Sequence, residues 1–239
     1  MQGTLQLRDV SISAGTQPVL NAINLEVGEG ELHLLLGPNG SGKSSLLAGI
    51  MGLPPFRVTC GEILFRGERI DGLPTDARAR LGIGMAFQRP PSLEGVTVRR
   101  FREVLGASSS HMAEAEALDL NSFDDREVNV GFSGGEIKRW EVFKLFLQTP
   151  RFLLFDEPES GVDLEHIAGI GGAINRMAHS LDSEGARRSA LIITHTGLIL
   201  DYVDADAGHM MIDGRVVHSG KAGELFAHVQ RRGYKLPVG

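Results

Sequence analysis

The stretch GPNGSGKSS, at residues 37–45, constrains the fold of this 239-residue chain more than any other part of the sequence. It fits the pattern G-x-x-x-x-G-K-[ST] in full. The run ELHLLLG before it is almost wholly apolar, and helix-forming leucines follow between Lys43 and Met51. An ordinary glycine-rich turn does not need these flanks, whereas a phosphate-binding loop joins a buried parallel strand to a helix. The sequence therefore predicts such a loop in an α/β fold.

Each residue type in this loop has a physical role toward a nucleotide. The glycines let backbone N–H groups curl around phosphates. Lys43 is expected to reach the outer phosphates, and the Ser44 hydroxyl is expected to bind Mg²⁺. The candidate nucleotide-binding residues are Gly37, Pro38, Asn39, Gly40, Ser41, Gly42, Lys43, Ser44 and Ser45.

Polar side chains end three other apolar runs. RFLLFDE ends in Asp156 and Glu157, GIGMAFQ ends in Gln88, and SALIITH ends in His195. Open α/β sheets place their ligand crevice at the carboxyl ends of parallel strands, so these side chains should lie beside the phosphate loop. The candidate Mg²⁺ ligands are Ser44, Gln88 and Asp156. The candidate catalytic residues are Glu157, His195 and Gln88, with Glu157 acting on the attacking water.

A second candidate anion site lies at residues 132–140, where the chain reads FSGGEIKRW. Ser133 can cap a helix that runs to about Gln148, and Glu136 completes a capping box. The two glycines between them let a ligand approach the helix N-terminus, which carries partial positive charge. The residues alone do not explain why one chain carries two such sites.

The remaining pattern predicts a mixed α/β fold. Near-alternation of apolar residues over 4–13 and 19–27 predicts half-exposed antiparallel strands. The runs at 82–88, 151–156 and 189–195 predict buried parallel strands, the first of them central in the sheet. Residues 97–118 and 164–179 have helical patterns, a hairpin turns at Asp213 and Gly214, and a last helix spans about 221–232.

Composition excludes several classes of function. The formal net charge of −6 argues against broad electrostatic binding to nucleic acid. No segment approaches eighteen uninterrupted apolar residues, so we expect a cytoplasmic protein without direct membrane insertion. Cys60 is the only cysteine, which rules out an internal disulfide and predicts that this chain alone binds no iron–sulfur cluster.

Together these motifs resemble the ATP-binding-cassette (ABC) ATPases across almost the whole chain. The stretches that carry the resemblance are GPNGSGKSS, Gln88, FSGGE, LLFDEP, SGVD at residues 160–163, and His195, in the family's order. The resemblance implies a P-loop NTPase fold with a mixed parallel sheet core, an antiparallel β subdomain and a helical subdomain. It implies one domain over residues 1–239, with the catalytic core at about 1–88 and 150–239 and the helical subdomain at about 89–149. It also implies ATP and Mg²⁺ as cofactors.

The resemblance also implies a reason for two anion sites. In this family two copies meet head to tail in a transient, ATP-dependent homodimer, and the SGGE helix of one copy caps the terminal phosphate held by the other. The residues that would serve the partner's ATP are Ser133, Gly134, Gly135 and Glu136. The residues that match the family's D-loop, which runs along the dimer seam, are Ser160, Gly161 and Asp163.

Finer stretches resemble the SufC-type ATPases of iron–sulfur cluster assembly. They are MAFQRP at 85–90, NVGFSGGEIKRWE at 129–141, DEPESGVD at 156–163, and LILDYV with DGRVVHSG near the end. This likeness implies SufB- and SufD-like scaffold proteins as partners, on which ATP-driven dimerisation would promote cluster assembly. The alternative is the nucleotide-binding subunit of an ABC membrane transporter, although such subunits more often carry LSGGQ and DEPT.

Three features depart from these patterns. Leu198 stands where bacterial SufC-type chains tend to have arginine, and the segment from Gln88 to Ser133 is shorter than in many of them. ISAGTQPVL, at residues 12–20, offers no aromatic ring to stack on adenine. Ile12 or Val19 would have to replace that ring by apolar contact, which leaves the base selectivity open.

Overall fold

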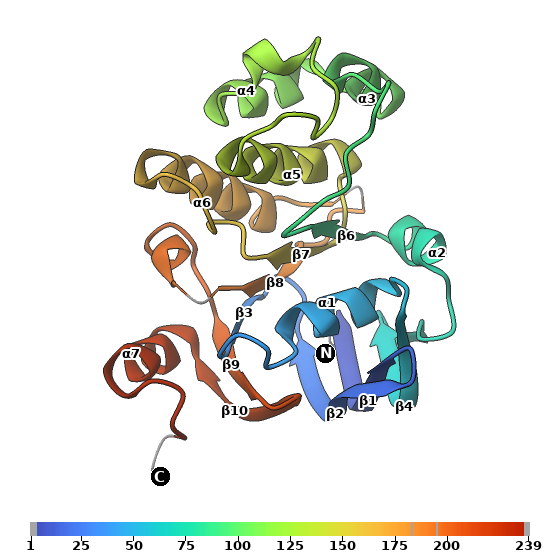
Figure 1. The fold of residues 1–239 in the computed structure, drawn as a ribbon, viewed down its shortest axis with the longest axis vertical. Helices are drawn as coiled ribbons and strands as arrows, with labels where there is room; N and C mark the ends of the chain where they lie inside the picture. Colours follow the sequence, from blue (N-terminus) through green and yellow to red (C-terminus); the bar gives the residue numbers. More distant parts are fainter. Residues whose placement is uncertain (1–3, 183, 195, 237–239) are drawn as a thin grey trace.

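The computed structural model describes residues 4–182, 184–194 and 196–236. Its centre is a six-stranded sheet in the order β10-β9-β3-β8-β7-β6 (Figure 1). The strands are β3 (Leu32–Leu36), β6 (Ile83–Ala86), β7 (Phe152–Asp156), β8 (Ser189–Ile193), β9 (Ala207–Ile212) and β10 (Arg215–Lys221). All neighbours pair in parallel except β9 and β10, which form the hairpin predicted around Asp213 and Gly214. The sheet is therefore mixed, and the carboxyl ends of five strands meet at one edge.

A second, four-stranded antiparallel sheet has the order β2-β1-β4-β5. Its strands are β1 (Leu5–Ala14), β2 (Gln17–Val27), β4 (Phe56–Phe65) and β5 (Glu68–Arg69). Helix α1 (Lys43–Met51) lies between this sheet and one face of the central sheet (Figure 1). The contact is close, because a Cβ atom at Gly49 would lie 2.3 Å from Cδ1 of Ile12. Residues of both sheets and of α1 form one apolar cluster, which anchors the phosphate loop at the start of α1.

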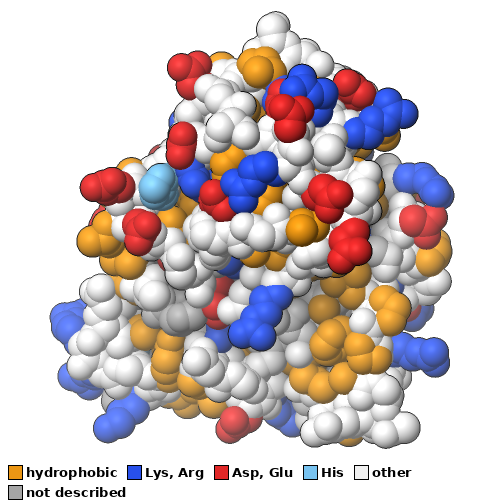
Figure 2. Space-filling model, turned by 45° about the horizontal axis from the view of Figure 1, so that its top comes forward, with side chains coloured by type: hydrophobic (Ala, Val, Ile, Leu, Met, Phe, Trp, Pro, Cys, Tyr) orange, Lys and Arg blue, Asp and Glu red, His pale blue; other side chains and the backbone are white. Residues whose placement is uncertain are grey.

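Helices cover the opposite face of the central sheet (Figure 1). Helices α5 (Gly134–Gln148) and α6 (Leu164–Ala178) share a second apolar cluster with that face, and α3 (Val98–Val104), α4 (Ser109–Ala117) and η1 (Asn121–Phe123) lie beyond them. Trp140 of α5 is fully buried against Phe101 and Phe143, so it belongs to the core. Figure 2 shows acidic and basic side chains intermixed over this helical layer. Within the described residues, no helix has the length and apolarity that crossing a membrane requires.

The position predicted for residues 82–88 was wrong. Strand β6 is the edge strand of the central sheet, whereas its apolar run predicts a central strand. All four of its residues are nevertheless buried, because α5 lies close against it. A Cβ atom at Gly84 would lie 2.9 Å from Cδ2 of Leu145. Burial by helices and burial by neighbouring strands leave the same apolar signature.

The other elements complete the frame. Helix α7 (Ala222–Arg232) packs on β9 and β10, as the pattern predicts, whereas the short helices α2 (Thr75–Arg80) and η2 (Leu198–Asp201) carry no strong sequence signal. In α2, the Arg78 guanidinium donates to the carbonyl oxygens of Gly49 and Ile50 at 2.8 Å. This buried arginine therefore closes the C-terminal end of α1, whose N-terminal end forms the phosphate loop.

Candidate nucleotide-binding site

The phosphate loop follows β3 and opens into a pocket of about 510 Å³ at the carboxyl edge of the central sheet. The pocket is lined by Val19, Asn39, Gly40, Gly42, Lys43, Ser44, Ser45, Gln88, Glu157 and Ser160. Parallel sheets of this kind bind ligands at that edge. Of the two apolar candidates for the base, Val19 lines the pocket, whereas Ile12 is fully buried beneath α1 and does not.

Two glycines of the loop are required by its geometry. Gly42 adopts φ 100°, and a Cβ atom there would lie 2.5 Å from Cδ2 of Leu20. A Cβ atom at Gly37 would lie 2.3 Å from the carbonyl oxygen of Met211. The loop therefore lies tightly between β2 and β9, and its curvature needs a residue without a side chain.

Lys43 is the buried cation of the pocket. Its Nζ atom donates to the carbonyl oxygens of Gly37 at 2.8 Å and Pro38 at 3.0 Å. Burial lowers the pKa of Lys43, while the nearby carboxylates of Glu157 and Asp156 act in the opposite direction. The ammonium group is thus held by neutral carbonyls, which an incoming phosphate oxygen can replace.

Ser44 and Asp156 meet in the structure, as predicted for a strand-end carboxylate that lies beside the phosphate loop. The Ser44 hydroxyl donates to Oδ1 of Asp156 at 3.0 Å. Burial raises the pKa of Asp156 and the charge of Glu157 raises it further, whereas the Ser44 hydrogen bond lowers it. A cation between these two oxygens would relieve the unfavourable burial of the carboxylate, so the pair fits Mg²⁺, which prefers hard oxygen ligands.

Gln88 and Glu157 form the second pair, which bridges the ends of β6 and β7. The Gln88 side-chain amide donates to Oε2 of Glu157 at 2.5 Å. Glu157 adopts φ 51°, an unusual conformation for a residue other than glycine, and its N–H donates to the carbonyl oxygen of Ile193 on β8. Such backbone conformations concentrate at functional sites. The third predicted catalytic residue, His195, lies outside the described residues.

The capping box predicted at Ser133 is present at the start of α5. The Ser133 hydroxyl accepts from the N–H of Glu136 at 3.3 Å, and the Glu136 carboxylate accepts from the N–H of Ser133 at 2.7 Å. Gly134 and Gly135 lie near the carbonyl oxygen of Gly161, so this terminus adjoins the predicted D-loop. Residues 133–136 do not line the phosphate-loop pocket, nor do Gly161 and Asp163, whereas Ser160 does. The structure therefore assembles one site at the sheet edge and presents a second, separate helix terminus.

Comparisons with known proteins decide the family. The family model described as ABC transporter matches residues 20–160. The chain belongs to the ABC family of ATPases. A probable ABC transporter ATP-binding protein of Streptococcus pyogenes is 35% identical over 96% of this chain and 93% of its own length. The probable ATP-dependent transporter SufC of Escherichia coli is 34% identical over 96% of this chain and 97% of its own length.

A solved structure shares the fold. It is an ATP-binding cassette in a dimeric, post-hydrolysis state bound to ADP and Pi, with a TM-score of 0.75 and 22% identity over 91% of this chain and 98% of its own.

Three charged residues around the site of this ABC ATPase are not among those predicted from the sequence. Lys138 of α5 donates to the carbonyl oxygen of Asp156 at 3.2 Å, and its burial lowers its pKa. Glu141, also on α5, accepts from the N–H of Phe87 at 2.8 Å, next to Gln88. Glu159 accepts from Thr194 and Thr196. A signal existed for the first two, because charged residues three apart on an otherwise apolar helix face must have buried partners.

Proposed function

We propose that this ABC ATPase binds and hydrolyses ATP in a head-to-tail dimer of two copies and thereby drives iron–sulfur cluster assembly on a SufB/SufD-type scaffold. One observation carries the nucleotide part. The cation Lys43, the pair Ser44–Asp156 and the pair Gln88–Glu157 come from the loop after β3 and from the ends of β6 and β7, and all of them except Asp156 line one pocket. Such a set of fixed charges and donors stabilises a transferring phosphoryl group by electrostatics.

Within this proposal Lys43 and the loop amides bind the outer phosphates. The phosphate would exchange for the carbonyl oxygens that now hold the ammonium group. The negative charge would also offset the burial that lowers the pKa of Lys43, which keeps the side chain charged in the complex.

Mg²⁺ would be held by Ser44 and Asp156, with the side-chain oxygen of Gln88 as a third ligand. When bound, Mg²⁺ would neutralise charge on the β- and γ-phosphate oxygens. The Gln88 amide nitrogen faces Glu157, so the same side chain can connect the metal site to the catalytic carboxylate.

Glu157 is the residue we assign to the attacking water. The Gln88 contact fixes its carboxylate, and the left-handed backbone aims the side chain from the end of β7 into the pocket. A carboxylate in this position can orient the water and accept its proton.

The Glu157→Gln variant tests the hydrolysis step. It should bind ATP, lose turnover by about 10²-fold or more because the general base is gone, and accumulate as a dimer. Phosphate release and sedimentation velocity measure the two effects, and Glu68→Gln, an exposed carboxylate on β5, is the matched control. A Glu157→Gln variant with wild-type turnover would remove Glu157 from this role.

The role in iron–sulfur cluster assembly on a SufB/SufD-type scaffold is supported by the SufC-like stretches and by the similarity to Escherichia coli SufC. The second candidate, a transporter's nucleotide-binding subunit, is favoured by the Streptococcus pyogenes relative. An anaerobic pull-down from native cells in mild detergent, with the tagged Glu157→Gln variant and ATP, separates the two. Soluble SufB-like proteins in the eluate would support cluster assembly, and a polytopic membrane protein would replace it with transport.

A further inference from the structure

The first turn of α5 contains backbone amides that attract an anion and a carboxylate that repels one. The capping box satisfies the N–H groups of Ser133 and Glu136, and no acceptor within the described residues takes the N–H groups of Gly134 and Gly135. These two amides are available to an anion. Glu136, however, places an ionised carboxylate in the same turn, because its hydrogen bonds with Arg126 hold its pKa at about 2. A lone carboxylate there would repel a phosphate.

Arg126 neutralises that carboxylate. Its guanidinium donates to Oε1 of Glu136 at 2.9 Å and to Oε2 at 3.1 Å, a two-pronged ion pair. The same side chain donates to the carbonyl oxygen of Gly131 at 3.2 Å. Arg126 therefore binds both the first turn of α5 and the loop that leads into it. Planar, two-pronged pairs of this kind are specific to arginine.

Two aromatic rings hold the guanidinium in place. Its central carbon lies 4.4 Å from the ring centroids of both Phe123 and Phe132, and these rings pack edge to face at 5.0 Å. The backbone of Arg126 is fixed as well, since its N–H donates to Phe123 and its carbonyl accepts from Val98. This arrangement pre-organises one cation at the helix terminus.

We propose that Arg126 is a positioning residue for the reaction in trans: it cancels the charge of Glu136 so that the α5 terminus can receive the terminal phosphate of a partner copy's ATP. The inference rests on the proposed function and adds to it a residue outside the SGGE stretch. The proposal predicts that the ATP concentration needed for dimerisation rises as the net charge of residues 126 and 136 becomes more negative.

Four chains that all carry Glu157→Gln test this ordering. The parent has a neutral pair, Arg126→Met leaves −1, Glu136→Gln leaves +1, and the double variant restores zero while glutamine keeps a capping box. The readout is the ATP concentration for half-maximal dimerisation, measured by sedimentation velocity. Arg126→Met should need about three- to tenfold more ATP, the double variant should return to the parent value, and Glu136→Gln should need less. A fifth chain, Arg126→Lys in the same Glu157→Gln background, keeps the charge and should stay near the parent.

Salt and monomer binding separate charge from structure. The gap between Arg126→Met and the parent should narrow as NaCl rises from about 50 mM to about 500 mM, because screening weakens the repulsion. Binding of a fluorescent ATP analogue to the monomer should be equal in the parent and in Arg126→Met, because Arg126 does not line the chain's own pocket. A defect that persists in the double variant, or equal midpoints in all four chains, would overturn the inference alone. Failure of the parent to dimerise with ATP would instead overturn the proposed function, and the inference with it.

Discussion

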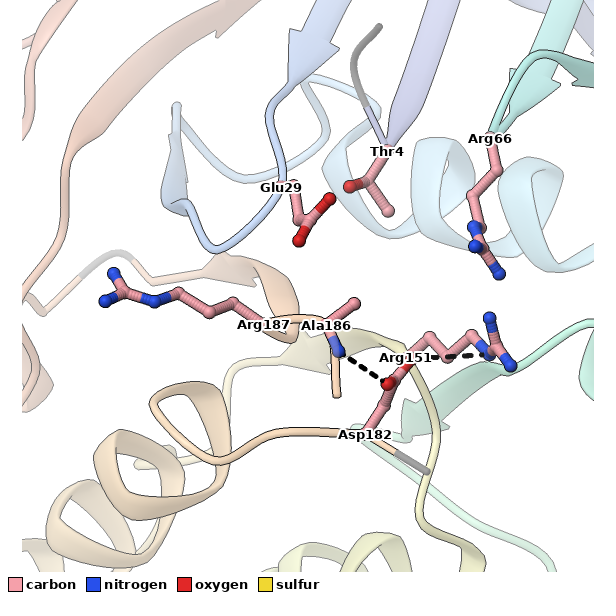
Figure 3. Close-up of a pocket in the computed structure, with 7 residues that line it drawn as sticks. All are labelled: Thr4, Glu29, Arg66, Arg151, Asp182, Ala186 and Arg187. Carbon is pink, nitrogen blue, oxygen red and sulfur yellow. Dashed lines mark hydrogen bonds and ion pairs between the residues drawn. The ribbon is translucent and has the colours of Figure 1, made fainter. Parts of the chain in front are cut away.

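Two polar pockets lie at opposite ends of the same strands. The phosphate-loop pocket opens where β3 and β7 end, and a second pocket of about 250 Å³ opens where β3, β7 and β8 begin (Figure 3). The second is lined by Thr4, Glu29, Arg66, Arg151, Asp182, Ala186 and Arg187. Three arginines line this pocket, whereas one lysine is the only cation among the described residues that line the other. Judged by its lining residues alone, the arginine-lined pocket would be the better candidate for an anion site.

The partners of those arginines lead to the opposite conclusion. Arg151 pairs with Asp182 at 3.5 Å and with Glu184, and Arg66 pairs with Glu184 at 3.2 Å. Asp182 also accepts from the N–H groups of Glu184 and Ala186. Two of the three arginines of this pocket are thus paired with carboxylates, and these ion pairs join the end of β4 to the start of β7.

The two pockets differ in whether their cations already have carboxylate partners. In the phosphate-loop pocket the ammonium group of Lys43 has only carbonyl acceptors and forms no ion pair within the described residues. In the arginine-lined pocket Arg66 and Arg151 are already compensated, and an anion added between them would have to displace carboxylates. We therefore expect the first pocket to determine binding and the second to determine stability.

The largest expected effect is on nucleotide binding through Lys43. Lys43→Met keeps the aliphatic stem but removes the charged donor, so affinity for ATP should fall by about 100-fold or more. Isothermal titration calorimetry measures the loss, and Arg187→Met at the rim of the other pocket is the matched control. Comparable weakening by Arg187→Met would break the distinction between the two pockets.

A fall in pH should lower the stability of the central sheet, whose strands connect both pockets. His33 on β3 and His209 on β9 are buried, with 3.0 Å between Nδ1 of His33 and Nε2 of His209, and Glu31 and Ser219 flank the pair. Burial and the neighbouring His33 lower the pKa of His209 from 6.5 to about 4. The folded protein therefore holds a neutral imidazole that the unfolded chain protonates below about pH 6.5.

The sign of the pH effect follows from that shift. Stability from His209 is complete above pH 6.5 and declines as pH falls toward 4, by an amount on the order of 2 kcal/mol at pH 5. Urea titrations at pH 7.5 and 5 measure the loss, which His209→Gln should reduce and His218→Gln, on β10, should not. An unchanged loss in His209→Gln would assign the pH dependence to other groups.

The smallest effect concerns the arginine-lined pocket itself. Arg151→Met should lower the free energy of unfolding by about 1–2 kcal/mol, because Asp182 and Glu184 lose a shared partner at a partly exposed site. ATP affinity should stay within about twofold of wild type, since the change leaves the other strand ends untouched. Urea denaturation measures the stability, and calorimetry measures the ATP affinity. A loss of ATP affinity without a loss of stability would show that this pocket also communicates with the nucleotide.

The parts of the candidate site that the sequence predicts are those encoded by local runs. GPNGSGKSS, the acids after LLF, and the capping box at Ser133 each specify a backbone shape through neighbouring residues, and the structure contains all three. Parallel strands then bring Gln88 to Glu157, because their carboxyl ends share one edge. The position of β6 at the edge of the sheet could not be predicted in this way, because it depends on whether another strand pairs with its free side.

By itself, then, the sequence determined the phosphate loop, the strand-end acids and the α/β frame, because close neighbours in the chain carry the required glycines, apolar runs and caps. Only the tertiary structure decided which charges are compensated. Arg126 lies ten residues from Glu136, and Arg66 lies 118 residues from Glu184. Whether a charge remains available to a ligand depends on these through-space partners, and Coulomb interactions follow distance in space and local burial, not separation along the chain.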